Sequence, residues 1–204
     1  IEKNDRTQIV QDWKGNICEI SSEYGLEYLR HAIDFVTRRW IKCPVETEAD
    51  WADMKRRYDA NDPLRLPENP AELGAKLKDR TYPTIMAFSG PFWQVREWMG
   101  FENTCMALIE KPGFVHEQIK FWEEYVATLM TKAFKYYIPD EVHISEDMAY
   151  KGFSMISPAM CREFLMPTWK RWGEIARGAG VKIYAVDSDG FIGELIPLWI
   201  ESGL

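Results

Sequence analysis

Acidic side chains close two short apolar segments in the second half of the chain. One segment ends in Glu146-Asp147 and the other in Asp187-Ser188-Asp189. In parallel sheets ligands bind at the carboxyl ends of strands, so these side chains would gather at one edge of the sheet. Neighbouring carboxylates repel one another unless a cation, a proton or a basic group lies among them. The pattern therefore predicts a divalent metal site or a general acid–base pair.

Four carboxylates are the catalytic candidates: Glu146, Asp147, Asp187 and Asp189. The predicted ligands of zinc or another divalent metal are three of these: Asp187, Asp189 and Glu146. Arg96 and Lys151 could supply the counter-charge. The structural alternative is that Asp147 or Asp187 only caps the following turn, as Asp commonly does.

The predicted substrate-binding residues include aromatic and polar side chains close to the same strand ends. Trp93 and Tyr150 could form walls around a flat organic ligand. Ser89, directly after the first predicted strand, Arg96 and Lys151 complete this set. By contrast, His143 lies inside a predicted strand, where a hydrogen-bonded structural role is the favoured interpretation.

Strands and helices alternate from residue 83 to the end of the chain. Apolar runs predict strands, and apolar residues at steps of three or four predict helices, in the order strand 83–88, helix 113–136, strand 141–145, helix 158–177, strand 181–186 and helix 192–202. Pro167 should kink the second helix. This order is the signature of right-handed βαβ units around a parallel sheet. Periodicity alone leaves open whether that sheet is an open one or part of a barrel.

The first part of the chain has a different pattern. Residues 7–20 alternate around Gly15-Asn16 and predict a β-hairpin. A short capped helix should begin at Thr47, and Pro63 breaks the chain after it. We expect one partial domain over residues 1–204. Its parts would be the hairpin and a helical connection at 1–82 and a βαβαβα part at 83–204.

Composition narrows the classes of function. The 204 residues are 46% hydrophobic and carry a formal charge of −7, which argues against a nucleic-acid surface. No apolar run approaches the ~20 residues that span a bilayer, so no membrane partner is expected. The four cysteines have no metal or disulfide spacing and indicate reduced thiols in a cytoplasmic protein. Walker, Rossmann, G-x-S-x-G and H-E-x-x-H motifs do not occur.

Two strand–loop–helix segments resemble the uroporphyrinogen-decarboxylase superfamily. They are residues 146–167, with Glu-Asp-Met-Ala-Tyr-Lys and Met-Ile-Ser-Pro, and residues 187–199, with Asp-Ser-Asp-Gly. The resemblance implies a (β/α)₈ TIM barrel, of which this chain would hold about three central strands beside its N-terminal hairpin. The chain starts at Ile1, and we expect it to be a piece of a longer barrel.

The resemblance does not fix the reaction, because this superfamily contains both decarboxylases and methyltransferases. Its thiol-directed methyltransferases place a His-x-Cys pair where this chain has Asp187-Ser188-Asp189, which argues against a thiolate-rich zinc centre. The arginine-rich segment with which its decarboxylases grip carboxylates does not occur in this chain.

Our leading hypothesis is a methyltransferase-like enzyme. It would move a methyl group from a small methylated or methoxylated compound to a corrinoid protein. The second hypothesis is a decarboxylase of uroporphyrinogen or a similar polycarboxylate, which needs no cofactor. The third is a barrel that binds a ligand without catalysis. A small-molecule substrate is expected in the first two, and the sequence leaves a homodimer open.

Overall fold

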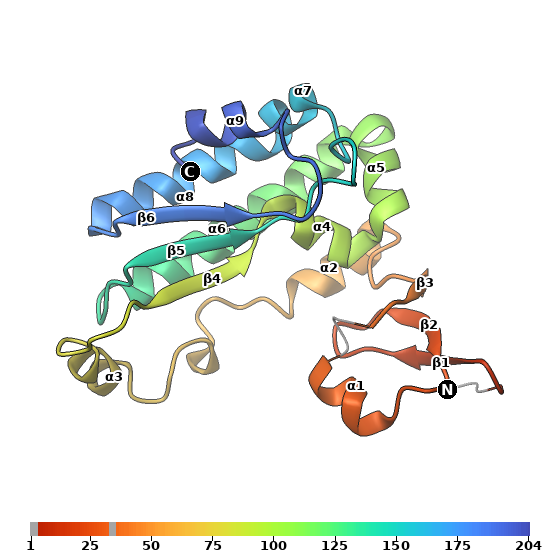
Figure 1. Cartoon of the computed structure of the whole chain (residues 1–204), viewed down its shortest axis with the longest axis horizontal. Coiled ribbons are helices and arrows are strands. Elements are labelled where there is room, and N and C mark those ends of the chain that lie inside the picture. The colour runs from red at the N-terminus through yellow and green to blue at the C-terminus, as the bar shows by residue number, and fades with distance from the viewer. Residues whose placement is uncertain (1–3, 33–35) are drawn as a thin grey trace. The chain divides into compact units, whose positions relative to one another are not determined.

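The computed structural model describes residues 4–32 and 36–204, which form two three-stranded sheets with helices (Figure 1). None of the helices in this part of the chain is long and apolar enough to cross a membrane. The prediction of one partial domain over 1–204 includes residues 1–3 and 33–35, which lie outside the described part, and it stays a prediction.

The chain groups into two compact units. The first contains residues 1–57 and 96–104, and the second contains residues 58–95 and 105–204. Helix α4 (Pro91–Met99) and helix α5 (Phe101–Glu110) each contribute to both units.

The first unit is built on an antiparallel sheet, whose strands are β1 (Thr7–Gln11), β2 (Ile17–Ser21) and β3 (Arg39–Lys42). The predicted hairpin is confirmed. Its turn is held by the Asp12 carboxylate, which accepts hydrogen bonds from the backbone N–H groups of Lys14 and Asn16. Gly15 has a φ of 101°, a conformation in which only glycine is unstrained. Helices α1 (Leu26–Ala32) and α2 (Glu48–Lys55) lie wholly within this unit.

Helix α2 begins where the sequence predicts it. Thr47 and Asp50 form a reciprocal capping box, in which the Thr47 hydroxyl accepts from the Asp50 N–H and the Asp50 carboxylate accepts from the Thr47 N–H. This arrangement satisfies two backbone donors at the start of the helix.

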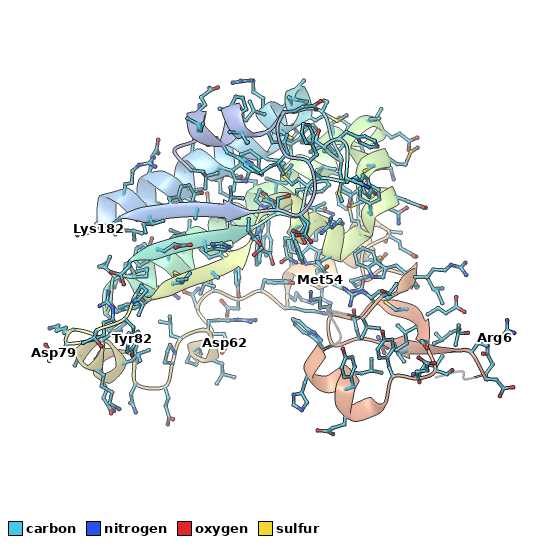
Figure 2. All side chains as sticks on the ribbon, in the orientation of Figure 1. Arg6, Met54, Asp62, Asp79, Tyr82 and Lys182 are labelled. Atoms are coloured by element: carbon cyan, nitrogen blue, oxygen red, sulfur yellow. The ribbon has the colours of Figure 1, made fainter. Side chains whose placement is uncertain are left out.

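The second unit is built on a parallel sheet in the order β4 (Ile85–Ser89), β5 (Glu141–Ser145) and β6 (Ile183–Asp187). All three strands run in the same direction in Figure 1, and Figure 2 shows the side chains on the same ribbon. The other elements of this unit are the 3₁₀ turn Pro63–Arg65, α3 (Pro70–Lys76), α6 (Pro112–Ala133), α7 (Pro158–Met160), the π-helical turn Cys161–Leu165, α8 (Met166–Ala179) and α9 (Ile196–Glu201).

Helices α6 and α8 cover one face of the parallel sheet (Figure 1). From that face Phe88 packs edge-to-face on Trp172, with ring centroids 5.0 Å apart, and the Tyr184 hydroxyl donates to the Trp169 carbonyl. The central strand is fully buried there through Val142 and Ile144. The opposite face carries exposed or half-exposed side chains, including Ile85 and Ile183 at 58% and 51%.

The prediction of a (β/α)₈ barrel is wrong. In the described residues β4 and β6 each pair only with β5, so the parallel sheet keeps two unpaired edges, and the other three strands form a separate antiparallel sheet. The predicted strands and the α/β alternation are present. Alternation of strands and helices is the same in open and closed sheets, and only the pairing of the edge strands separates them.

The three helices predicted in the parallel unit are present, with two differences, and the sequence did not predict α4 and α5 before them. Close to Pro167, where a kink is predicted, the structure has the π-helical turn Cys161–Leu165, which ends two residues before the proline. A proline in mid-helix removes one backbone hydrogen bond, and the wider turn absorbs the change. The last helix, α9, is shorter than the predicted 192–202.

A network of charges joins α6 to α8. The Arg171 guanidinium binds both Glu123, which is buried, and Glu124, and Lys120 also pairs with Glu123. The Thr168 hydroxyl adds a hydrogen bond to Glu123 at 3.0 Å. Hydrogen bonds from Arg171 hold the pKa of Glu124 at about 2.

We expect Arg171→Leu to lower the free energy of unfolding by about 1–2 kcal/mol at pH 7. The value is moderate because the Arg171 side chain is 37% exposed and Glu123 keeps two other partners. The pKa of Glu124 is depressed in the folded state, so its contribution is present above the unfolded pKa of about 4.3 and is lost as the pH falls toward 2.

Urea unfolding at pH 7 and pH 3 checks this prediction. Arg162→Leu is the matched control, because Arg162 pairs with Glu201 between exposed side chains and its loss should change little. An equal loss in both variants, or a difference that does not shrink at pH 3, would contradict the proposed role of the network.

Candidate functional site

The parallel sheet presents three rows of side chains on its uncovered face. By the strand register, Ile85, Glu141 and Ile183 form the first row, Ala87, His143 and Ala185 the second, and Ser89, Ser145 and Asp187 the third. The third row lies at the carboxyl edge. Polar side chains thus alternate with the buried Val142 and Ile144 along β5.

His143 is at the centre of this face and joins two carboxylates. Its Nδ1 lies 2.8 Å from Oε1 of Glu141, on the same strand, and its Nε2 lies 3.2 Å from Oδ1 of Asp187, on β6. The side chains of Glu141 and His143 are 20% and 28% exposed, whereas that of Asp187 is 59% exposed. The imidazole is therefore partly accessible to solvent.

The charge state of His143 follows from this geometry. Partial burial alone would lower its pKa, but the hydrogen bonds to Glu141 and Asp187 outweigh burial and raise the pKa above its ordinary value. An imidazole with a carboxylate at each nitrogen is stabilised as the cation, in which both nitrogens donate.

Glu146 has a different position from the other predicted carboxylates. Its side chain is fully buried, with Oε1 accepting from Nε1 of Trp169 at 2.7 Å and Oε2 accepting from the backbone N–H of Trp93 at 3.2 Å. Trp93 lies in the first turn of α4, where a negative charge is favourable. A Cβ atom at Gly90 would overlap the Glu146 carboxylate. The structure thus gives Glu146 contacts that support the packing of α4 and α8.

The loops after β5 and β6 are tied to each other. Oδ1 of Asp147 accepts from the Asp189 N–H at 3.0 Å, and the Ser188 hydroxyl accepts from the Met148 N–H at 2.8 Å. Asp147 has a φ of 39°, in the left-handed region that Asp tolerates better than most residues. These bonds bring Asp147 and Asp189 together, near the end of the strand that carries Asp187.

The remaining predicted residues are spread over several elements. Ser89 ends β4 in the same row as Asp187 and accepts a hydrogen bond at its carbonyl from Nε1 of Trp122. The loop after β5 exposes Lys151 and Tyr150, whose ring meets Phe153 edge-to-face at 5.9 Å. Trp93 is half-buried on α4, and Arg96 belongs to the first unit, unlike the other predicted site residues.

No arrangement for a metal ion occurs in the part of the chain that the structure describes. Among those residues, no three His, Cys, Asp or Glu side chains come together in a way that could hold one. The described residues therefore do not fit a zinc site built from Glu146, Asp187 and Asp189.

The sequence interpretation gave His143 a structural role and did not include Glu141. A signal for both was present, since polar residues at 141, 143 and 145 alternate with apolar ones. Strands of parallel sheets that are covered on both faces read as continuous apolar runs. Side chains at every second position share one face, so the pattern indicates a polar face.

Comparisons of the chain with protein-family models, with curated proteins and with solved structures found no match. The superfamily resemblance of residues 146–167 and 187–199 therefore stays a prediction.

The hydrogen bond from Trp169 to Glu146 can be tested with a matched pair of indoles. Trp169→Phe removes the donor to a buried carboxylate, which should cost about 1–3 kcal/mol beyond the loss of volume. Trp199→Phe is the control, because this buried indole contacts Trp169 edge-to-face but its Nε1 has no hydrogen-bond partner among the described residues. Urea unfolding followed by far-ultraviolet circular dichroism measures both, and equal losses would show that the indole N–H does not stabilise Glu146.

Proposed function

We propose that this chain is an enzyme that acts on a small methylated or methoxylated compound, with His143 as its general acid. The observation that carries the proposal is the His143 imidazole, held between Glu141 and Asp187 on the open face of the sheet. Proton donors of this kind accelerate reactions in which a poor leaving group departs.

The surroundings of His143 support access by a substrate. Its row neighbours on β4 and β6 are Ala87 and Ala185, the smallest side chains that a strand can offer apart from glycine. The Asp187 carboxylate is more than half exposed and only 3.2 Å from Nε2, so a substrate oxygen could replace it as the acceptor.

The charge of this edge favours an uncharged substrate over a polycarboxylate. Asp187 is the last residue of β6, and Asp147 and Asp189 lie in the loops after β5 and β6. Lys151 is the basic residue of the loop after β5. An excess of carboxylates repels a polyanion, whereas an ether or a methoxylated ring carries no charge to repel.

The proposed step breaks the bond between the substrate oxygen and its methyl carbon. The methyl group passes to an external nucleophile, which the superfamily resemblance implies is a corrinoid protein. The Nε2–H bond of His143 breaks as the oxygen takes this proton, so that the leaving group departs as a neutral alcohol. His143 is left neutral and regains a proton from water.

We expect His143→Gln to lower turnover by about 10²- to 10⁴-fold, and His116→Gln to leave it unchanged. The assay combines the full chain, free cob(I)alamin and a panel of methoxylated aromatic compounds, and follows methylated corrinoid by absorbance. The rate should fall as the pH rises through the raised pKa of His143. Asp187→Asn should move this fall to lower pH.

Each outcome decides between the hypotheses. Full turnover in His143→Gln would show that His143 is not the general acid. Release of carbon dioxide from a porphyrinogen without methyl transfer supports the decarboxylase instead. Wild-type protein that binds the compounds and converts none of them supports ligand binding without catalysis.

A further inference from the structure

The two hydrogen bonds of the His143 imidazole are unequal. The contact of Nδ1 with Glu141 is 2.8 Å long and lies between side chains that are at most 28% exposed. The contact of Nε2 with Asp187 is 3.2 Å long, and the carboxylate at its far end is 59% exposed. Water therefore competes with the second contact much more than with the first.

This inequality determines which nitrogen keeps its proton when the imidazolium becomes neutral. The proton in the shorter and better shielded hydrogen bond is the harder one to remove, and the hydrogen bond of one ring nitrogen fixes the state of the other. Deprotonation should therefore occur at Nε2. Free histidine in water has the opposite preference, with its proton on Nε2.

We propose that Glu141 is a positioning residue, which holds a proton on Nδ1 of His143 and so makes Nε2 the nitrogen that exchanges a proton with the substrate. The catalytic part of this inference rests on the proposed function. When Nε2 gives its proton to the departing oxygen, the product is the tautomer that Glu141 stabilises. A carboxylate that accepts from the far nitrogen of a catalytic imidazole acts in the same way in serine hydrolases.

The side chains next to Glu141 and His143 on β4 and β6 cannot accept the Nδ1 proton in place of Glu141. In the row of Glu141, β4 and β6 contribute Ile85 and Ile183, which do not titrate. In the row of His143 they contribute Ala87 and Ala185, which also do not titrate. The groups that raise the pKa of His143 are Glu141 and Asp187, one at each nitrogen.

Nitrogen-15 NMR of the imidazole rings tests the inference without any substrate. The chain has three histidines, and the His143→Gln spectrum assigns the resonances of His143. Above its pKa, wild-type His143 should carry its proton on Nδ1. Glu141→Gln should move the proton to Nε2, whereas Asp187→Asn should leave it on Nδ1. Glu163→Gln, beside His116, is the control that should not alter His143.

Turnover provides the second readout. Glu141→Gln should lower kcat on the order of 10²-fold with KM within about twofold, because the imidazole remains in place but in the wrong tautomer. A merely structural Glu141 would lower the thermal stability and leave the tautomer unchanged.

The outcomes separate the two proposals. A wild-type proton on Nε2, or an Nδ1 proton that persists in Glu141→Gln, overturns the positioning role alone. A proton on Nδ1 together with full turnover in His143→Gln overturns the proposed function, and with it the catalytic part of the role of Glu141.

Discussion

The carboxyl edge of the parallel sheet depends on one buried carboxyl group. Glu146 leaves the end of β5 and places its carboxylate against the first turn of α4 and the indole of Trp169 on α8. A polar group buried inside a protein is costly unless hydrogen-bond partners surround it. These partners come from two helices, so the end of β5 and both helices are fixed together. The same constraint requires glycine at position 90, where a Cβ atom would occupy the place of the carboxylate.

The two faces of β5 differ in burial and in chemistry. Val142 and Ile144 are fully buried under α6 and α8 and contribute to the apolar core, whereas Glu141 and His143 lie on the opposite face. A substitution on one face can therefore change stability with little effect on the chemistry of the other. The polar face stays accessible because no helix of the parallel unit covers it, unlike the faces of most parallel sheets.

Local features of the sequence predicted local structure well, and long-range pairing remained hidden. The capping box at Thr47 and the strand at 141–145 are defined by neighbours in sequence, and both occur as predicted. The barrel was wrong because its closure depends on the partners of edge strands, which periodicity does not encode. The contact of His143 with Asp187 depends on the register of β5 against β6, 44 residues apart, and the sequence alone could not give it.

The residues beside His143 on the neighbouring strands are alanines, so the backbone positions of these strands determine the space on either side of the imidazole. Ala87 and Ala185 have no side-chain torsions, so neither can swing aside to admit a larger ligand or close over a smaller one. The distance from the backbone of β5 to that of β4 or β6 is the interstrand spacing of about 4.8 Å. A ligand that reaches His143 therefore meets neighbours on β4 and β6 that cannot rearrange around it.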